Sequence, residues 1–149
     1  MTRQADYALR AIIYLTLNPQ GRIQEIARTQ YVPKEYLAKI IQKLARAEIV
    51  KTHRGVGGGI TLSRAPEDIT LLEVIEAIDG PVALNSCFIR PGECPRESYC
   101  GAHVELEHIG KALVKMLANV NFAQLARNET SLAAGIKIPS FDSDRTGKM

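Results

Sequence analysis

Apolar residues recur every three or four positions through the first 45 residues, the spacing that places side chains on one face of an α-helix. In the first stretch they are Tyr7, Ala8, Ala11, Ile12 and Leu15. The pattern stops at an Asn-Pro-Gln-Gly sequence at residues 18–21, whose residue types favour a turn. The sequence therefore predicts a first helix near residues 3–17.

The same spacing predicts two further helices. A short one follows residue 22, and a longer one begins after Pro33, a residue tolerated at the first position of a helix. This order is typical of a helix-turn-helix, whose second helix lies in the major groove of DNA. The residues expected to face the bases are Lys34, Glu35, Tyr36, Ala38 and Lys39. Plain helix packing without DNA is the alternative, because helical pairs are common.

A glycine-rich hairpin is predicted next. Residues 49–53 and 60–62 have the composition of short strands, and the segment between them carries an arginine and four consecutive or near-consecutive glycines. Glycine lets a backbone approach a sugar-phosphate surface, and an arginine is able to enter a minor groove or bind phosphate. The wing residues expected to contact DNA are Arg54, Gly55, Gly57 and Gly58. A flexible turn with a solvated arginine is the alternative.

Two helices are predicted beyond the hairpin. One, at residues 70–79, starts with a capping box, and a long amphipathic one, at residues 103–122, needs an apolar partner. We expect that partner to be the same helix of a second copy in a homodimer, with packing onto the first helix as the alternative. The expected fold is mainly α with a small β-hairpin, a winged helix-turn-helix domain plus a long dimerisation helix. The expected segments are a DNA-binding domain at 1–80, a cysteine-rich loop at 81–102, a dimerisation helix at 103–127 and a flexible C-terminal tail at 128–149.

The distribution of charge supports a nucleic-acid partner. Residues 1–64 contain eleven Lys or Arg against four Asp or Glu, whereas residues 65–149 contain eight against twelve, so the two parts carry +7 and −4. A basic half is expected where a surface meets phosphates, here double-stranded promoter DNA. Lys43, Arg46 and Lys51 are phosphate contacts at most, and Tyr31 and Tyr99 are expected to be packing residues.

Other classes of protein are less consistent with the sequence. No apolar stretch approaches the roughly 20 residues of a membrane span, and the N-terminal residues lack a secretory pattern, so we expect a cytoplasmic protein with no membrane partner. No Gly-rich nucleotide fingerprint, Cys-x2-Cys pair or activated nucleophile is present, so we expect no small-molecule substrate and no enzyme.

The candidate chemistry lies in the cysteines. All three, Cys87, Cys94 and Cys100, fall within fourteen residues, and His103 follows closely. Thiolates in one loop are able to converge on a metal centre, and an odd number argues against a disulfide framework. Three alternatives remain: zinc bound by the same four residues, direct oxidation of the thiols without a metal, and a redox electron carrier.

Together these features resemble the bacterial winged-helix iron–sulfur transcription regulators of the IscR, NsrR and RirA type. The resemblance covers about residues 1–127 and depends on the helix-turn-helix, the wing sequence Arg-Gly-x-Gly-Gly-Gly, the helix start at residues 69–74 and the three-cysteine loop. It implies a homodimeric regulator, usually a repressor, that senses iron, redox state or nitric oxide through an iron–sulfur cluster.

The resemblance also implies a ligand set. Cys87, Cys94 and Cys100 would be thiolate ligands of the cluster. The fourth ligand would be His103, as in members with a [2Fe–2S] cluster, or Asp6 from the partner subunit, as in members with a [4Fe–4S] cluster. We favour His103, and with it [2Fe–2S], because it lies in the same loop. This chain has six residues between its first two cysteines where IscR-like members have five, so the cluster type does not transfer directly.

Overall fold

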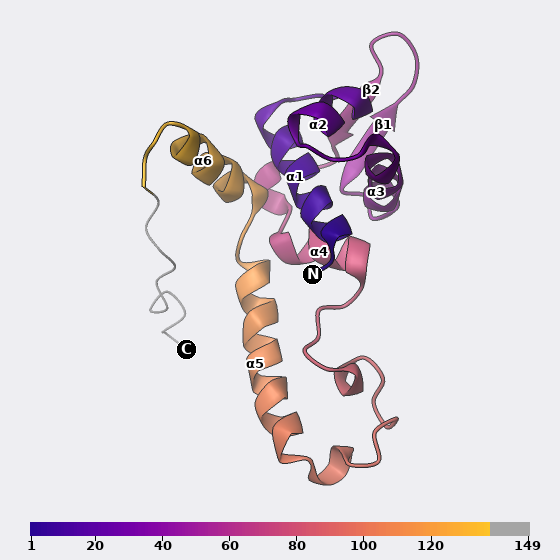
Figure 1. The fold of residues 1–149 in the computed structure, drawn as a ribbon, viewed down its shortest axis with the longest axis vertical. Coiled ribbons are helices and arrows are strands. Elements are labelled where there is room, and N and C mark those ends of the chain that lie inside the picture. The colour runs from indigo at the N-terminus through magenta and orange to yellow at the C-terminus, as the bar shows by residue number, and fades with distance from the viewer. Residues whose placement is uncertain (138–149) are drawn as a thin grey trace.

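The computed structural model describes residues 1–137, and the remainder of the predicted tail lies outside the described residues. The chain forms six α-helices and one two-stranded hairpin within this range (Figure 1). The elements are α1 (Arg3–Leu17), α2 (Ile23–Thr29), α3 (Lys34–Arg46), β1 (Val50–His53), β2 (Gly59–Leu62), α4 (Leu71–Asp79), α5 (Gly101–Ala118) and α6 (Phe122–Ala133). Three short 3-10 turns are Pro66–Asp68, Ser86–Phe88 and Glu97–Tyr99.

The core lies around α1, which packs against α3, α4 and α6. The apolar stripe predicted for α1 is buried, with Ala8, Ala11 and Ile12 fully inaccessible. The stripe of α3 faces the same core through Leu37 and Leu44. The prediction of a mainly α fold with a winged helix-turn-helix is confirmed.

The hairpin extends from this body as an antiparallel pair. Its register joins Val50 to Leu62 at the base and His53 to Gly59 next to the tip. Ile49, just before β1, and Ile60, in β2, are buried and hold the hairpin against the core. Figure 1 shows the tip, residues 54–58, projecting away from the helices.

The C-terminal part corrects two expectations. The single helix predicted over residues 103–122 is two helices, because α5 ends at Ala118 and Asn121 caps a new helix by accepting a hydrogen bond from the Gln124 N–H at 2.9 Å. Phe122 is fully buried, and α6 packs on α1. Residues 128–133 are thus the second half of a packed helix and are not part of a tail.

Helix α5 runs away from the body, beside the cysteine loop (Figure 1). None of its residues is buried, and Val104 and Ile109 are 52% and 56% exposed. On its polar face, the Lys111 ammonium lies 2.8 Å from Glu107 and lowers the pKa of that carboxyl group. No helix of residues 1–137 is long and apolar enough to cross a membrane.

Candidate nucleic-acid interface and cysteine loop

The first turn of α3 presents the side chains that the sequence assigned to DNA. Pro33 precedes the helix as its cap residue, with φ −59°, and Lys34, Glu35 and Tyr36 are exposed. Ala38 is partly buried and Lys39 is exposed. Leu37, one residue from this group, is fully buried, so the packing of α3 on the core determines which face is available to a partner.

One basic residue of α3 faces inward. The Lys43 ammonium donates hydrogen bonds to the Gln4 side-chain oxygen at 3.2 Å and to the Ile78 carbonyl at 3.1 Å. It therefore connects α3 to the N-terminal turn of α1 and to the C-terminal end of α4. In this structure the Lys43 ammonium joins three helices, and its use as a phosphate contact stays a prediction.

The wing has glycines for two different physical reasons. Gly55 and Gly57 have φ +94° and +82°, in the left-handed region that favours glycine. Gly58 has no room for a side chain, since a Cβ there would lie 2.4 Å from the His53 carbonyl oxygen. Arg54 is exposed at the base of this turn. The result is a narrow tip whose backbone is able to approach a partner surface, with a guanidinium beside it.

Three tyrosines, two of them near the turn of the helix-turn-helix and one in the cysteine loop, are exposed to solvent. Tyr31, between α2 and α3, is 86% exposed and has φ +54°, a backbone conformation that a bulky residue rarely adopts. Tyr36 is 53% exposed and Tyr99 is 69% exposed. The expectation that Tyr31 and Tyr99 pack in the body is wrong. The positive φ of Tyr31 carries no signal in the residue's own type, so sequence reasoning missed it.

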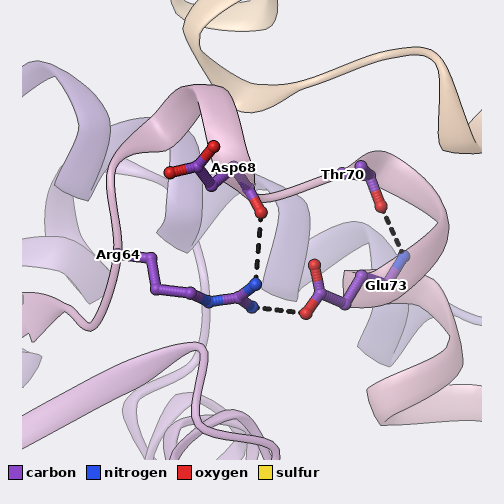
Figure 2. Close-up of polar contacts among 4 residues, drawn as sticks. All are labelled: Arg64, Asp68, Thr70 and Glu73. Carbon is purple, nitrogen blue, oxygen red and sulfur yellow. Dashed lines mark hydrogen bonds and ion pairs between the residues drawn. The ribbon is translucent and has the colours of Figure 1, made fainter.

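An ion pair that the sequence did not reveal connects the hairpin to α4 (Figure 2). The Arg64 guanidinium, just after β2, pairs with the Glu73 carboxylate and donates a hydrogen bond to the Asp68 carbonyl at 3.2 Å. Thr70 caps α4 by accepting a hydrogen bond from the Glu73 N–H at 3.2 Å. Half of the predicted capping box is therefore present, and the carboxylate that would complete it binds Arg64 instead.

The cysteine loop brings two of its predicted ligand segments together. Cys87 lies in the 3-10 turn Ser86–Phe88, and Cys100 is the residue that precedes α5. The Phe88 ring lies against the His103 imidazole with ring centroids 4.8 Å apart, so the segment of Cys87 is beside the first turn of α5. Cys94 is exposed on the turn between them. All three thiols are free.

These donor atoms are chemically suited to bind a metal ion or cluster, but the side chains do not converge on one point. Three thiols and one imidazole are suitable ligands for iron or zinc. The His103 Nδ1 is buried and has no hydrogen-bond partner, so its lone pair or N–H is not engaged by another residue of the chain. Within residues 1–137, however, no three His, Cys, Asp or Glu side chains lie close enough to hold one ion.

Asp6, the alternative fourth ligand, has a different environment. Its carboxylate lies 2.8 Å from the Arg10 guanidinium one turn along α1, and Arg10 also donates a 3.4 Å hydrogen bond to the Gln30 carbonyl. Both side chains of the pair are about two-fifths exposed, at 39% and 43%. The Asp6 carboxylate thus has a partner within its own subunit, whereas the His103 Nδ1 has none.

Comparisons with known proteins agree with this fold. Residues 1–128 match the model of the Rrf2 family, described as an iron-dependent transcriptional regulator. Protein aau3 of Rhizobium meliloti is 34% identical over 145 residues, covering 93% of this chain and 94% of the relative. The HTH-type transcriptional regulator NsrR of Bacillus subtilis is 30% identical over 142 residues, covering 93% and 97%.

Two solved structures share the fold at lower identity. The global cysteine regulator CymR of B. subtilis has a TM-score of 0.70 and 24% identity, and the alignment covers 86% of this chain and 96% of that one. IscR of T. potens also has a TM-score of 0.70, with 20% identity and 93% of each chain covered. These two similarities concern the fold alone.

Proposed function

The chain belongs to the Rrf2 family of transcriptional regulators, which are DNA-binding proteins and not enzymes. From this premise we propose that it acts in the cytoplasm as a homodimeric repressor of transcription. The repressor binds promoter DNA and responds to iron, redox state or nitric oxide through an iron–sulfur cluster. The observation that carries the proposal is the combination, in one chain, of an exposed helix start on α3, a projecting wing and a loop containing every cysteine of the sequence.

The DNA interface consists of two parts of one subunit. Lys34, Glu35, Tyr36, Ala38 and Lys39 read base edges from α3, while Arg54 with Gly55, Gly57 and Gly58 approaches a neighbouring groove or phosphate. Exposure of the α3 side chains and the narrow glycine tip support this assignment. Since the interface is basic, binding weakens as salt increases, because releasing the DNA's counterions into a more concentrated solution is less favourable.

Dimerisation occurs through α5. This helix of 18 residues extends about 27 Å at 1.5 Å per residue and has no buried residue in the single chain. Among its apolar positions, Ile109 is exposed and others are half-buried, namely Leu106, Leu113, Met116 and Leu117. The alternative partner within the chain, α1, already packs against α6. A second copy of α5 is the partner that would cover these residues.

The cluster is held by Cys87, Cys94 and Cys100 with His103 as the fourth ligand. A bound cluster supplies a centre whose redox state and integrity respond to the cell's conditions. The unpartnered His103 Nδ1 supports His103 over Asp6 and, with it, the [2Fe–2S] type. Because no three of these donors converge within residues 1–137, cluster binding would require the loop that carries Cys87 and Cys94 to rearrange relative to the first turn of α5, which Phe88 and His103 already join to it.

A second candidate has its own support. The cysteines are free and do not form a closed metal site, and Cys94 is exposed to solvent, so oxidants have access to it. In this case the regulator responds by sulfenic acid or disulfide formation, without a metal.

One experiment separates the candidates. The full chain is purified without oxygen, and its iron, sulfide, zinc and visible absorbance are measured for the wild type, Cys94→Ala and the matched loop control Ser98→Ala. An iron–sulfur cluster predicts a brown wild type and a brown Ser98→Ala with about equal iron and sulfide, and a colourless Cys94→Ala. A colourless wild type whose DNA binding changes with peroxide supports thiol oxidation, and stoichiometric zinc alone supports a zinc site. A wild type that binds no duplex in a random-library selection contradicts the regulator itself.

A further inference from the structure

The loop between α1 and α2 pairs with the wing, although the predicted DNA interface does not include it. Gly21 forms an isolated antiparallel bridge with Ile60 of β2, in which each N–H donates to the other residue's carbonyl, at 3.0 and 2.8 Å. Gly21 is buried, and a Cβ there would lie 2.7 Å from the Tyr14 ring. β2 is therefore held against the end of α1 at Ile60, along the edge that β1 leaves open.

The neighbouring residue reaches further along the hairpin. The Gln20 side-chain amide donates a hydrogen bond to the Gly57 carbonyl at 2.7 Å. Within the part of the chain that the structure describes, no other side chain from outside the hairpin forms a hydrogen bond with residues 54–58. The tip has little other support, since Val56 is fully exposed and a Cβ at Gly55 would meet no atom within 4 Å.

Gly59 leaves the space that the Gln20 amide occupies. A Cβ at this position would lie 2.7 Å from the Gln20 Nε2 and 3.0 Å from the Gly21 carbonyl oxygen. The φ of Gly59 is outside the left-handed region, so its backbone conformation does not demand glycine. A side chain here would instead crowd both the Gln20 amide and the Gly21 carbonyl oxygen, so the Gln20 amide could keep its present place only by the absence of a side chain.

We propose that Gln20 is a positioning residue for the wing, which orients the tip for DNA before binding and does not itself read the bases. This inference depends on the proposed function, in which the wing contacts DNA. A tip that is already ordered loses less conformational freedom on binding than a free one. One exposed hydrogen bond contributes about 1 kcal/mol, so its removal should weaken DNA binding about fivefold.

The test compares Gln20→Met, which keeps the length of the side chain but lacks the donor, with Gln124→Met on α6 as the matched control. The probe is a 30-bp duplex that the wild type selects from a random-sequence library. Gln20→Met is expected to bind it about fivefold more weakly, with an unchanged thermal midpoint and lower backbone order parameters at Val56 and Gly57 in the free protein. Affinity within twofold of the wild type, or tip order equal to that of the wild type, would overturn the proposal.

A coupling measurement adds a readout that a purely structural role would not affect. Gly59→Ala is expected to displace the amide and weaken DNA binding in the wild-type background, and to cost less in a Gln20→Ala background, where the amide is absent. Additive losses would overturn the proposal.

The variant Arg54→Ala distinguishes a failure of the Gln20 proposal from a failure of the proposed function. If Arg54→Ala binds DNA as tightly as the wild type, the wing is not in the interface, and both the proposed interface and the role of Gln20 are wrong. If Arg54→Ala weakens binding and Gln20→Met does not, only the role of Gln20 is wrong.

Discussion

Phe122 offers a direct test of how the C-terminal helices are attached to the body. Its side chain is fully buried, its N–H donates a 3.1 Å hydrogen bond to the Ile69 carbonyl, and it begins the helix that packs on α1. Replacing a fully buried Phe by Ala costs about 3–5 kcal/mol, because apolar area is exposed and a cavity remains. For a domain of this size, each kcal/mol lowers the thermal midpoint by about 2–4 °C.

The expected result for Phe122→Ala is therefore a loss of about 3–5 kcal/mol in the free energy of unfolding, measured by urea denaturation. Phe122→Leu, which keeps much of the volume, is expected to lose less than about 1.5 kcal/mol. Leu132→Ala is the control on the same helix, since Leu132 is 60% exposed and should change stability by no more than about 0.5 kcal/mol.

All variants are compared at one protein concentration, because the stability of a dimer depends on it. A loss below about 1 kcal/mol for Phe122→Ala, or equal losses for Phe122→Ala and Leu132→Ala, would refute the packing of α6 on the body. Either result would favour the single long helix followed by a tail that the sequence predicts for the residues after Ala118.

Three other predictions concern the DNA interface and the loop. Arg54→Ala is expected to weaken DNA binding about tenfold and to reduce the salt slope by about one, as measured by fluorescence anisotropy at several salt concentrations; an unchanged slope would show that Arg54 does not meet a phosphate. His103→Ala is expected to alter the visible absorbance of the anaerobic protein, whereas Asp6→Ala leaves it unchanged, and the reverse pattern would assign Asp6 as the ligand. Tyr31→Gly is expected to raise stability to urea by about 0.5–1 kcal/mol, since glycine removes the cost of the left-handed backbone; a loss would contradict strain at this turn.

The candidate site was only partly predictable from the sequence. The identity and spacing of Cys87, Cys94, Cys100 and His103 indicated a ligand set, because residue types determine which metals can be bound. The spacing did not indicate that Phe88 would join two of these segments and leave Cys94 on an exposed turn. Such a geometry depends on the path of a long irregular loop, which neither helical nor strand periodicity describes.

The helices from α1 to α4 and the hairpin were determined by the sequence itself, because apolar periodicity, turn residues and caps act within a few neighbouring positions. Tertiary structure decided the break after Ala118, the inward direction of Lys43, the pairing of Arg64 with Glu73 and the contact of Gln20 with the wing. Each of these features joins segments that are distant in the chain or depends on burial against another element. Local patterns contain no information on which partner a side chain meets, so only the packed fold could decide them.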